Sequence, residues 1–148
     1  MSPRRRAREV ALQILFAMDA GEPNDAKTAL KTHDLQFAAA EEEEGGAPAD
    51  PFDRAYTEEL VAGVTAHRAE LDGHLEKLSR SWRIERMARL DRNILRLALF
   101  ELVHHREDVP ARVVLNEAVE LAKLFGAAES PAFVNGMLDS ALDLLGLR

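Results

Sequence analysis

The chain has 148 residues, and its length and composition fit one globular domain. It contains no cysteine, which excludes disulfide scaffolds, thiolate nucleophiles and cysteine-ligated metal sites. Ala and Leu supply 45 residues whereas Val, Ile and Thr supply 16, and this bias favours helices over strands. We therefore expect an all-α protein.

The formal net charge of −7 is unevenly distributed along the chain. Residues 41–59 alone carry a net −7, so the rest of the sequence sums to zero. Within that remainder, residues 1–16 carry a net +3 and residues 78–106 carry a net +4. Basic zones of this kind are where a polyanion would bind first.

The first half of the chain predicts three helices and one loop. A helix over 3–20 has a single apolar face, made by Ala7, Val10, Ala11, Ile14 and Met18. A weaker helical pattern follows over 25–39. Residues 41–51 combine acidic residues with two Gly and two Pro, which predicts an exposed, mobile acidic loop. A third, long helix is expected over 51–78.

The second half predicts four more segments. A short one over 79–86 contains Trp82, and a helix over 89–105 is apolar around most of its circumference, as a central buried helix should be. Pro110 then begins a sixth helix that Gly126 ends.

The seventh helix is expected to begin at Ser130-Pro131, where the Ser130 side chain can accept from the first-turn amides. It runs to about Leu145. Gly136, inside this helix, predicts that another part of the chain packs closely against it.

Residues 4–20 superficially resemble a secretory signal, because arginines precede an apolar stretch. Glu9, Gln13 and Asp19 interrupt that stretch, and no run in the chain approaches the ~20 apolar residues of a membrane span. We expect a cytoplasmic protein that does not contact a membrane.

The sequence offers little support for catalysis. It has no phosphate-binding loop, zinc-protease motif or serine elbow. Glu101-x-x-His104 is half of a helical di-iron motif, and a second copy is missing. A solvated helix end carrying Glu101, His104, His105 and Arg106 is the favoured interpretation. We predict no enzyme activity, cofactor or metal.

The first helix has the features of an RNA-binding surface. With Ala7 at 0°, Arg5 lies at about 160°, Leu12 at about 140° and Phe16 at about 180°, away from the apolar face. Guanidinium groups bind phosphates, and an exposed ring can stack on an unpaired base. The alternative is that Leu12 and Phe16 pack against another helix.

The second basic zone is weaker evidence, because arginines at every third position do not form one stripe on an α-helix. Arg89, Arg92 and Arg96 do share one side. That side needs water, carboxylate partners or phosphate.

Three blocks of sequence carry a family resemblance. They are RRRAREVALQILF at 4–16, LDRNILRLALFEL at 90–102 and VPARVVLNEAVELAKLFGAAESPAFVNGMLD at 109–139. In this order they closely resemble the NusB family of bacterial transcription antitermination factors. The resemblance implies one RNA-binding domain over 1–148, built as about seven helices in two stacked bundles.

The resemblance also implies partners and site residues. The expected ligand is single-stranded boxA RNA of ribosomal-RNA leaders, bound together with the small-subunit ribosomal protein that acts as Nus factor E, and through them the RNA polymerase antitermination complex. The matching RNA positions are Arg4, Arg5, Arg6, Arg8, Phe16, Arg96, Glu129, Ser130 and Phe133. Glu85 and Asp91 match the surface for the ribosomal protein.

A second function class remains open at this point. The chain could be a homodimeric helical scaffold whose interface covers the basic helix, without direct RNA binding. The acidic loop could mask the arginines in the free protein, although a solubilising surface loop is the simpler interpretation.

Overall fold

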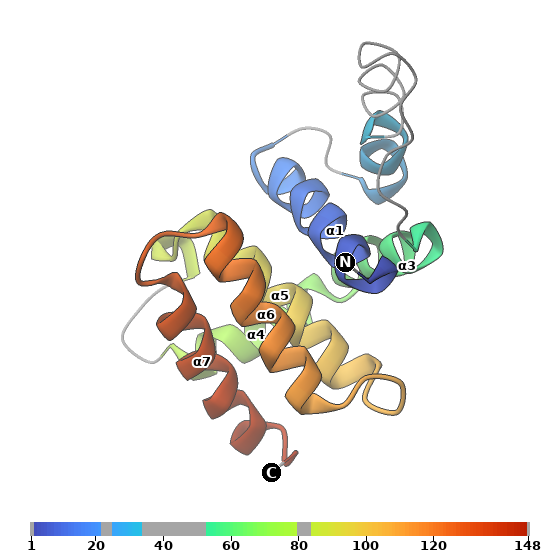
Figure 1. The fold of residues 1–148 in the computed structure, drawn as a ribbon. Helices are drawn as coiled ribbons and strands as arrows, with labels where there is room; N and C mark the ends of the chain where they lie inside the picture. The colour runs from blue at the N-terminus through green and yellow to red at the C-terminus, as the bar shows by residue number, and fades with distance from the viewer. Residues whose placement is uncertain (1, 22–24, 34–52, 80–83, 148) are drawn as a thin grey trace. The chain divides into compact units, whose positions relative to one another are not determined.

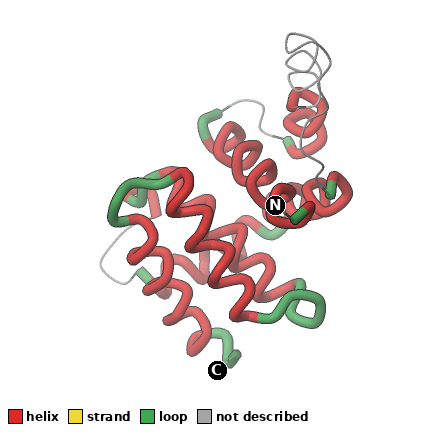
Figure 2. The backbone as a smooth tube through the Cα atoms, viewed as in Figure 1, coloured by secondary structure: helices red, strands yellow, loops and turns green. Residues whose placement is uncertain are grey.

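A computed structural model describes residues 2–21, 25–33, 53–79 and 84–147. Within these ranges the chain consists of helices and short turns without any strand (Figure 2), so the all-α prediction is confirmed. The chain divides into two compact helical units, Met1–Thr65 and Ala66–Arg148. No helix in the described ranges has the length and apolar character needed to cross a bilayer.

The first unit contains α1 (Pro3–Asp19), a helical segment over 26–33, and α3 (Arg54–Ala66). Helix α1 begins where the sequence predicts, because the Ser2 hydroxyl accepts from the Arg5 amide at 3.1 Å and proline occupies the first turn. Before the 26–33 segment, the Asp25 carboxylate accepts from the Thr28 amide at 2.8 Å, and this bond lowers the pKa of Asp25.

Helices α1 and α3 are held together by both backbone and side-chain bonds. The Thr57 hydroxyl donates to the Ala7 carbonyl at 2.9 Å, and the Asp53 amide donates to the Pro3 carbonyl at 3.1 Å. The predicted apolar face of α1 is confirmed, since all five of its residues are buried. Helix α3 adds Tyr56, Leu60, Val61 and Val64 to the buried set.

The second unit contains α4 (Arg68–Leu78), a short 3-10 turn η1 (Ile84–Arg86), α5 (Arg89–His104), α6 (Ala111–Phe125) and α7 (Ser130–Leu144). Helix α5 contacts α4, α6 and α7, and α6 and α7 lie side by side (Figure 1). Residues 93–102 of α5 are all buried, so the prediction of a central helix is confirmed.

The prediction of a single long helix over 51–78 was wrong. It is two helices, α3 and α4, separated at His67, whose φ of −106° and ψ of 16° are not helical. Apolar positions continue in phase across the break, because Val64 and Leu71 are seven residues apart and both are buried. The pattern that predicts a helix therefore gave no sign of the interruption.

The predicted end of α6 at Gly126 is confirmed, whereas Ser130 and Gly136 differ from expectation. A Cβ on Gly126 would lie 2.6 Å from the Ser130 Cβ and 2.7 Å from the Ala122 carbonyl oxygen, so the end of α6 needs glycine for close approach. The Ser130 hydroxyl accepts from the Ala127 amide at 3.0 Å, in the turn before α7, and not from the first-turn amides. At Gly136 a Cβ would meet nothing within 4 Å, so the predicted close neighbour is wrong.

The end of α5 is less solvated than predicted. His104 and Arg106 are exposed, but Glu101 and His105 are buried. Periodicity placed Glu101 correctly on α5 but could not show that neighbouring segments cover it. Three predictions lie outside the described residues: the short segment with Trp82, the part of the 25–39 helix after residue 33, and the acidic loop at 41–51.

Candidate nucleic-acid interface

Positive charge is concentrated at the start of α1. The first turn of this helix contains arginines and no acidic residue. The amino terminus of a helix already carries a partial positive charge, so arginines there lower helix stability, whereas a bound anion would raise it. The local charge is therefore unfavourable for folding and favourable for a phosphate ligand.

The four predicted phosphate-binding arginines have different environments. Arg4 and Arg5 are exposed. The Arg6 guanidinium is half-buried and pairs with the Glu9 carboxylate at 2.8 Å. Arg8 is only 4% exposed. The structure thus presents two of the four arginines to solvent and holds the other two within the fold.

Tyr56, on α3, lies against two of these arginines. The Arg4 guanidinium carbon is 4.2 Å from the centre of the Tyr56 ring, and that of Arg8 is 5.6 Å from it. The Tyr56 amide donates to the Asp53 carboxylate at 3.0 Å, which fixes the start of α3. The ring attracts the guanidinium through its π face without neutralising it, so Arg4 keeps its charge and its donors for another ligand.

Phe16 and Leu12 separate the two interpretations of the outer side of α1. Leu12 is 1% exposed, as the alternative of packing against another helix predicts. Phe16, by contrast, is 39% exposed, as the RNA-binding interpretation predicts. All residues from Ala7 to Leu12 are buried, and six consecutive residues face every side of a helix. The surface predicted on the first helix is therefore interrupted: Arg4 and Arg5 are exposed at one end of α1 and Phe16 near the other.

Arg5 and Phe16 still lie on the same side of α1. They are eleven residues apart, which corresponds to about 16 Å along the axis and a rotation of about 20°. A strand of RNA that used both would contact α1 at two points and pass over the buried middle of the helix.

Arg96 does not lie on an open surface. It is 3% exposed, and its Nε and Nη2 atoms donate to the two Asp72 carboxylate oxygens at 2.7 and 3.0 Å. This bidentate pair joins α5 to α4. The sequence left water, a carboxylate or a phosphate as the partner for this side of α5. Arg96 has the carboxylate, which argues against a phosphate contact. Arg92 donates to the Ile84 carbonyl at 3.2 Å.

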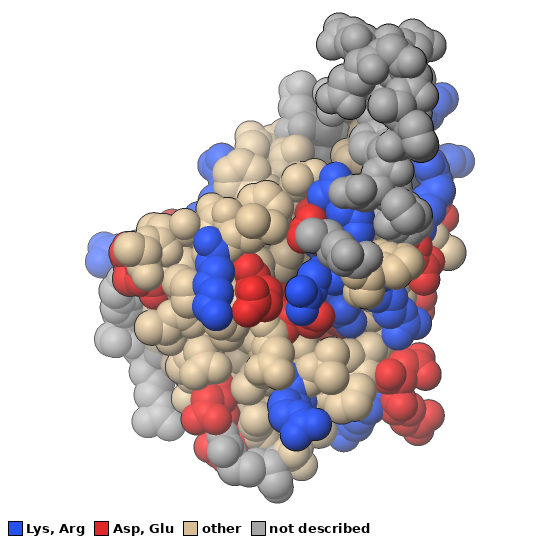
Figure 3. Space-filling view, viewed as in Figure 1, with Lys and Arg blue, Asp and Glu red and all other residues tan. Residues whose placement is uncertain are grey.

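The three predicted RNA-binding positions around the start of α7 differ in their exposure to solvent. Glu129 is exposed, Ser130 is buried and holds the turn through Ala127, and Phe133 is half-buried. On the face drawn in Figure 3, basic and acidic side chains are interspersed among uncharged ones. Of the three, Glu129 and Phe133 keep some exposed surface for a ligand.

The two positions predicted for the ribosomal protein lie at the start of α5 and just before it. Glu85 is exposed in η1, whereas Asp91 is buried in the first turn of α5. The Asp91 Oδ1 atom is buried and has no hydrogen-bond partner among the described residues. A buried carboxylate oxygen without a partner costs stability, which is a common feature of sites that bind another molecule.

Sequence reasoning missed the residues that set these environments. Neither Tyr56 nor Asp72 was predicted to take part in a site. Both act through contacts between helices, which periodicity along one helix does not reveal. Two helical units, a cationic helix end and an exposed aromatic ring are features of a helical nucleic-acid-binding protein.

Comparisons with known proteins are consistent with that class. The model of the NusB family matches residues 5–143. The transcription antitermination protein NusB of Geotalea uraniireducens is 48% identical over 145 residues, covering 98% of this chain and 97% of the relative. That of Sorangium cellulosum is 46% identical over 146 residues, covering 99% and 96%.

Solved structures agree with the sequence relatives. T. maritima NusB matches with a TM-score of 0.78 at 27% identity, covering 96% of this chain and 92% of that one. A crystal structure of the antitermination factors NusB and NusE in complex with dsRNA matches with a TM-score of 0.71 at 26% identity, covering 95% and 96%. The chain belongs to the NusB family of transcription antitermination factors, and the resemblance carried by the three sequence blocks is confirmed.

Proposed function

We propose that this chain is a non-enzymatic adaptor that binds single-stranded boxA RNA of ribosomal-RNA leaders together with the ribosomal protein Nus factor E. Through both it joins the antitermination complex of RNA polymerase. The proposal treats residues 1–148 as one RNA-binding domain that works in the cytoplasm.

The observation that supports the proposal best is the start of α1. Arg4 and Arg5 are exposed at a helix amino terminus that has no acidic residue in its first turn. In the proposed complex these two arginines contact phosphates, and Phe16 stacks on a base further along. Arg6 and Arg8 support the surface through their contacts within the first unit, whereas Arg96 joins α5 to α4 in the second.

Asp91 and Glu85 support the second half of the proposal. Within the described residues the buried Asp91 Oδ1 atom has no hydrogen-bond partner, and Glu85, six positions earlier, is exposed, so a donor from the ribosomal protein would satisfy that oxygen. Asp91→Asn keeps the shape and removes the charge, and it should weaken binding of the ribosomal protein at least tenfold. Glu107→Gln, at an exposed site elsewhere, is the matched control.

The rival interpretation is a homodimeric scaffold without direct RNA binding. Four large apolar side chains of α6 and α7 are exposed, namely Val113, Leu124, Phe125 and Leu144. They are divided between the two ends of the paired helices, so they do not form one broad patch, and scattered apolar residues are normal on a monomer. The exposed residues therefore give the scaffold no specific support.

Binding to boxA RNA, measured with and without the ribosomal protein, tests the proposal. The expected result is weak binding by the chain alone and tighter binding with the partner, whereas RNA with a scrambled boxA binds weakly in both. Size-exclusion chromatography in parallel detects the rival. A stable dimer that ignores boxA RNA in both conditions would contradict the proposal.

A further inference from the structure

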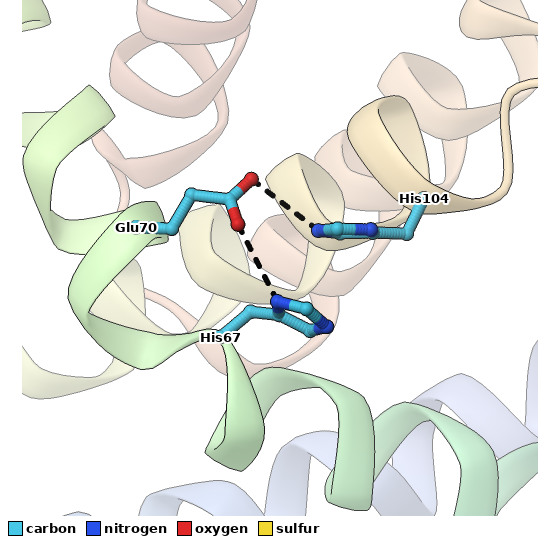
Figure 4. Close-up of side chains that lie close together, drawn as sticks. All are labelled: His67, Glu70 and His104. Carbon is cyan, nitrogen blue, oxygen red and sulfur yellow. Dashed lines mark ion pairs between the residues drawn. The ribbon is translucent and has the colours of Figure 1, made fainter.

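Three side chains outside the proposed RNA surface bring their metal-binding atoms together. His67 lies at the start of α4, Glu70 in its first turn and His104 in the last turn of α5 (Figure 4). One ligand atom from each residue lies within 4.8 Å of the others. The Glu70 carboxylate lies between the two imidazoles, with Oε2 3.4 Å from His67 Nδ1 and Oε1 3.3 Å from His104 Nε2.

Packed elements hold the two histidines in place. The His67 and His104 rings stack with centroids 4.0 Å apart, and Phe100 stacks against His104 with centroids 5.2 Å apart. Phe100 is buried in the middle of α5, and α4 and α5 pack against each other. His104 is therefore held on the packed helix α5, whereas His67 is the non-helical residue directly before α4 and is held by ring stacking.

The distances fit a metal site better than a hydrogen-bonded cluster. N–H···O hydrogen bonds usually measure about 2.7–3.2 Å, so both nitrogen–oxygen distances are long for that role. In a tetrahedral zinc site with bonds of about 2.0–2.1 Å, neighbouring ligand atoms lie about 3.3–3.4 Å apart. The two distances, 3.4 and 3.3 Å, each have the length of such an edge, but they involve different oxygens of Glu70, so a carboxylate that binds through one oxygen accounts for one of them.

Charge favours the same interpretation. Metal ligation uses neutral imidazoles, so a bound dication would face one carboxylate and two uncharged donors. It would lie between the carboxyl end of α5, where the helix dipole favours a cation, and the amino end of α4, where it does not, so the two helix dipoles offset each other and the Glu70 carboxylate supplies the favourable charge.

We propose that His67, Glu70 and His104 form a surface site for a divalent first-row metal ion, with zinc as the best match. Imidazole and carboxylate ligands suit zinc, and three protein ligands leave a fourth position for water. The bound ion would tie the start of α4 to the end of α5. The sequence analysis predicted no metal because it tested only Glu101 as the carboxylate ligand beside His104. Glu101 is buried, and in the proposed site Glu70 is the carboxylate ligand instead.

Zinc titration of tag-free protein tests the site, because a histidine tag would bind the ion itself. We expect one high-affinity zinc ion per chain by calorimetry. Loss of an outer-shell partner alone costs about 10–100-fold in metal affinity, so removal of a ligand should cost at least about 100-fold. The ligand variants are His67→Ala, Glu70→Gln and His104→Ala, and the control is His74→Ala, a half-buried histidine of α4 outside the cluster.

Two further readouts keep the test independent of folding defects. Glu70→Gln preserves side-chain shape, and circular dichroism and the Tm without metal confirm that each variant is folded. In the wild type, zinc should raise the Tm as its concentration increases, and Co²⁺ in its place should give the visible absorption of a four-coordinate site. Neither shift nor absorption should occur in Glu70→Gln.

The proposal is overturned if the wild type binds no zinc, or if folded Glu70→Gln and His104→Ala bind it as tightly as the His74→Ala control. It does not rest on RNA binding. Its failure would leave the proposed function intact, and failure of boxA binding would leave the metal site intact.

Discussion

Two regions of the molecule place the same side chain, arginine, in opposite environments: the start of α1, with Arg4 and Arg5, and the middle of α5, with Arg96. The α1 pair is exposed at a helix end that has no acidic residue in its first turn. Arg96 is buried and binds both oxygens of Asp72. The comparison teaches that basic zones with the same sequence pattern can be exposed at a helix end or buried against a carboxylate, and we propose the RNA surface at the exposed one.

The difference follows from position in the fold. Helix α5 is the central helix of its unit, so a guanidinium there has to carry its own counter-charge, and Asp72 on α4 supplies it. The start of α1 is solvated, so its arginines need no carboxylate for stability. Arg4 instead lies over the Tyr56 ring, which orients the guanidinium and leaves its charge in place.

The largest expected effect is on the buried pair. Arg96→Ala leaves the Asp72 carboxylate without its main partner and should lower the free energy of unfolding by about 3 kcal/mol. Arg68→Ala is the matched control, since Arg68 contacts the same carboxylate at 3.9 Å from an exposed position and should cost under about 0.5 kcal/mol. Urea unfolding measures both.

RNA binding by the Arg96→Ala variant sharpens the comparison. Below its unfolding transition, the folded protein should bind boxA RNA within about twofold of the wild type, since 1.4 kcal/mol would already be tenfold. Full stability combined with lost RNA binding would reverse the roles that we assign to the two regions.

The next effect is on the exposed pair. Replacing both Arg4 and Arg5 with Ala should weaken boxA binding about 100-fold, because each charged contact to a phosphate contributes about 1.5 kcal/mol or more. Stability should be unchanged or slightly raised, since positive charge is removed from a helix amino terminus. Arg112→Ala, an exposed arginine in the first turn of α6, is the control for charge alone. Equal losses in the two variants would contradict a local site.

The smallest expected effect is on Phe16. Phe16→Ala should weaken RNA binding by about 1–3 kcal/mol if the ring stacks on a base, with little change in Tm because the side chain is already exposed. Phe125 has nearly the same exposure, 37% against 39%, so Phe125→Ala is a close chemical control. A fall in Tm without a change in affinity would favour packing over stacking.

Most of the helices could be predicted from the sequence, but the contacts between them, which decide which charged side chains are buried, could not. The apolar face predicted α1, Pro110 and Gly126 bracketed α6, and the apolar pattern identified α5 as central. These signals are local, so they can be interpreted along one helix.

Burial of charge could not be predicted in this way. Arg8 and Arg96 carry the same pattern as exposed arginines, and only contacts between helices show that they are covered. The break at His67 was hidden because the apolar spacing continues through it. In the cluster of His67, Glu70 and His104, the last residue lies 34 positions from Glu70 and 37 from His67, so no spacing rule connects it to them.

The salt dependence of boxA binding tests the central claim most directly. Each phosphate contact to a single strand contributes a slope of about −0.7 on log–log axes. Two exposed arginines predict a slope of about −1.4, and four would give about −2.8. The account predicts the smaller slope for the wild type and a nearly flat response for the Arg4→Ala, Arg5→Ala double variant. A slope that stays the same in the double variant would contradict it.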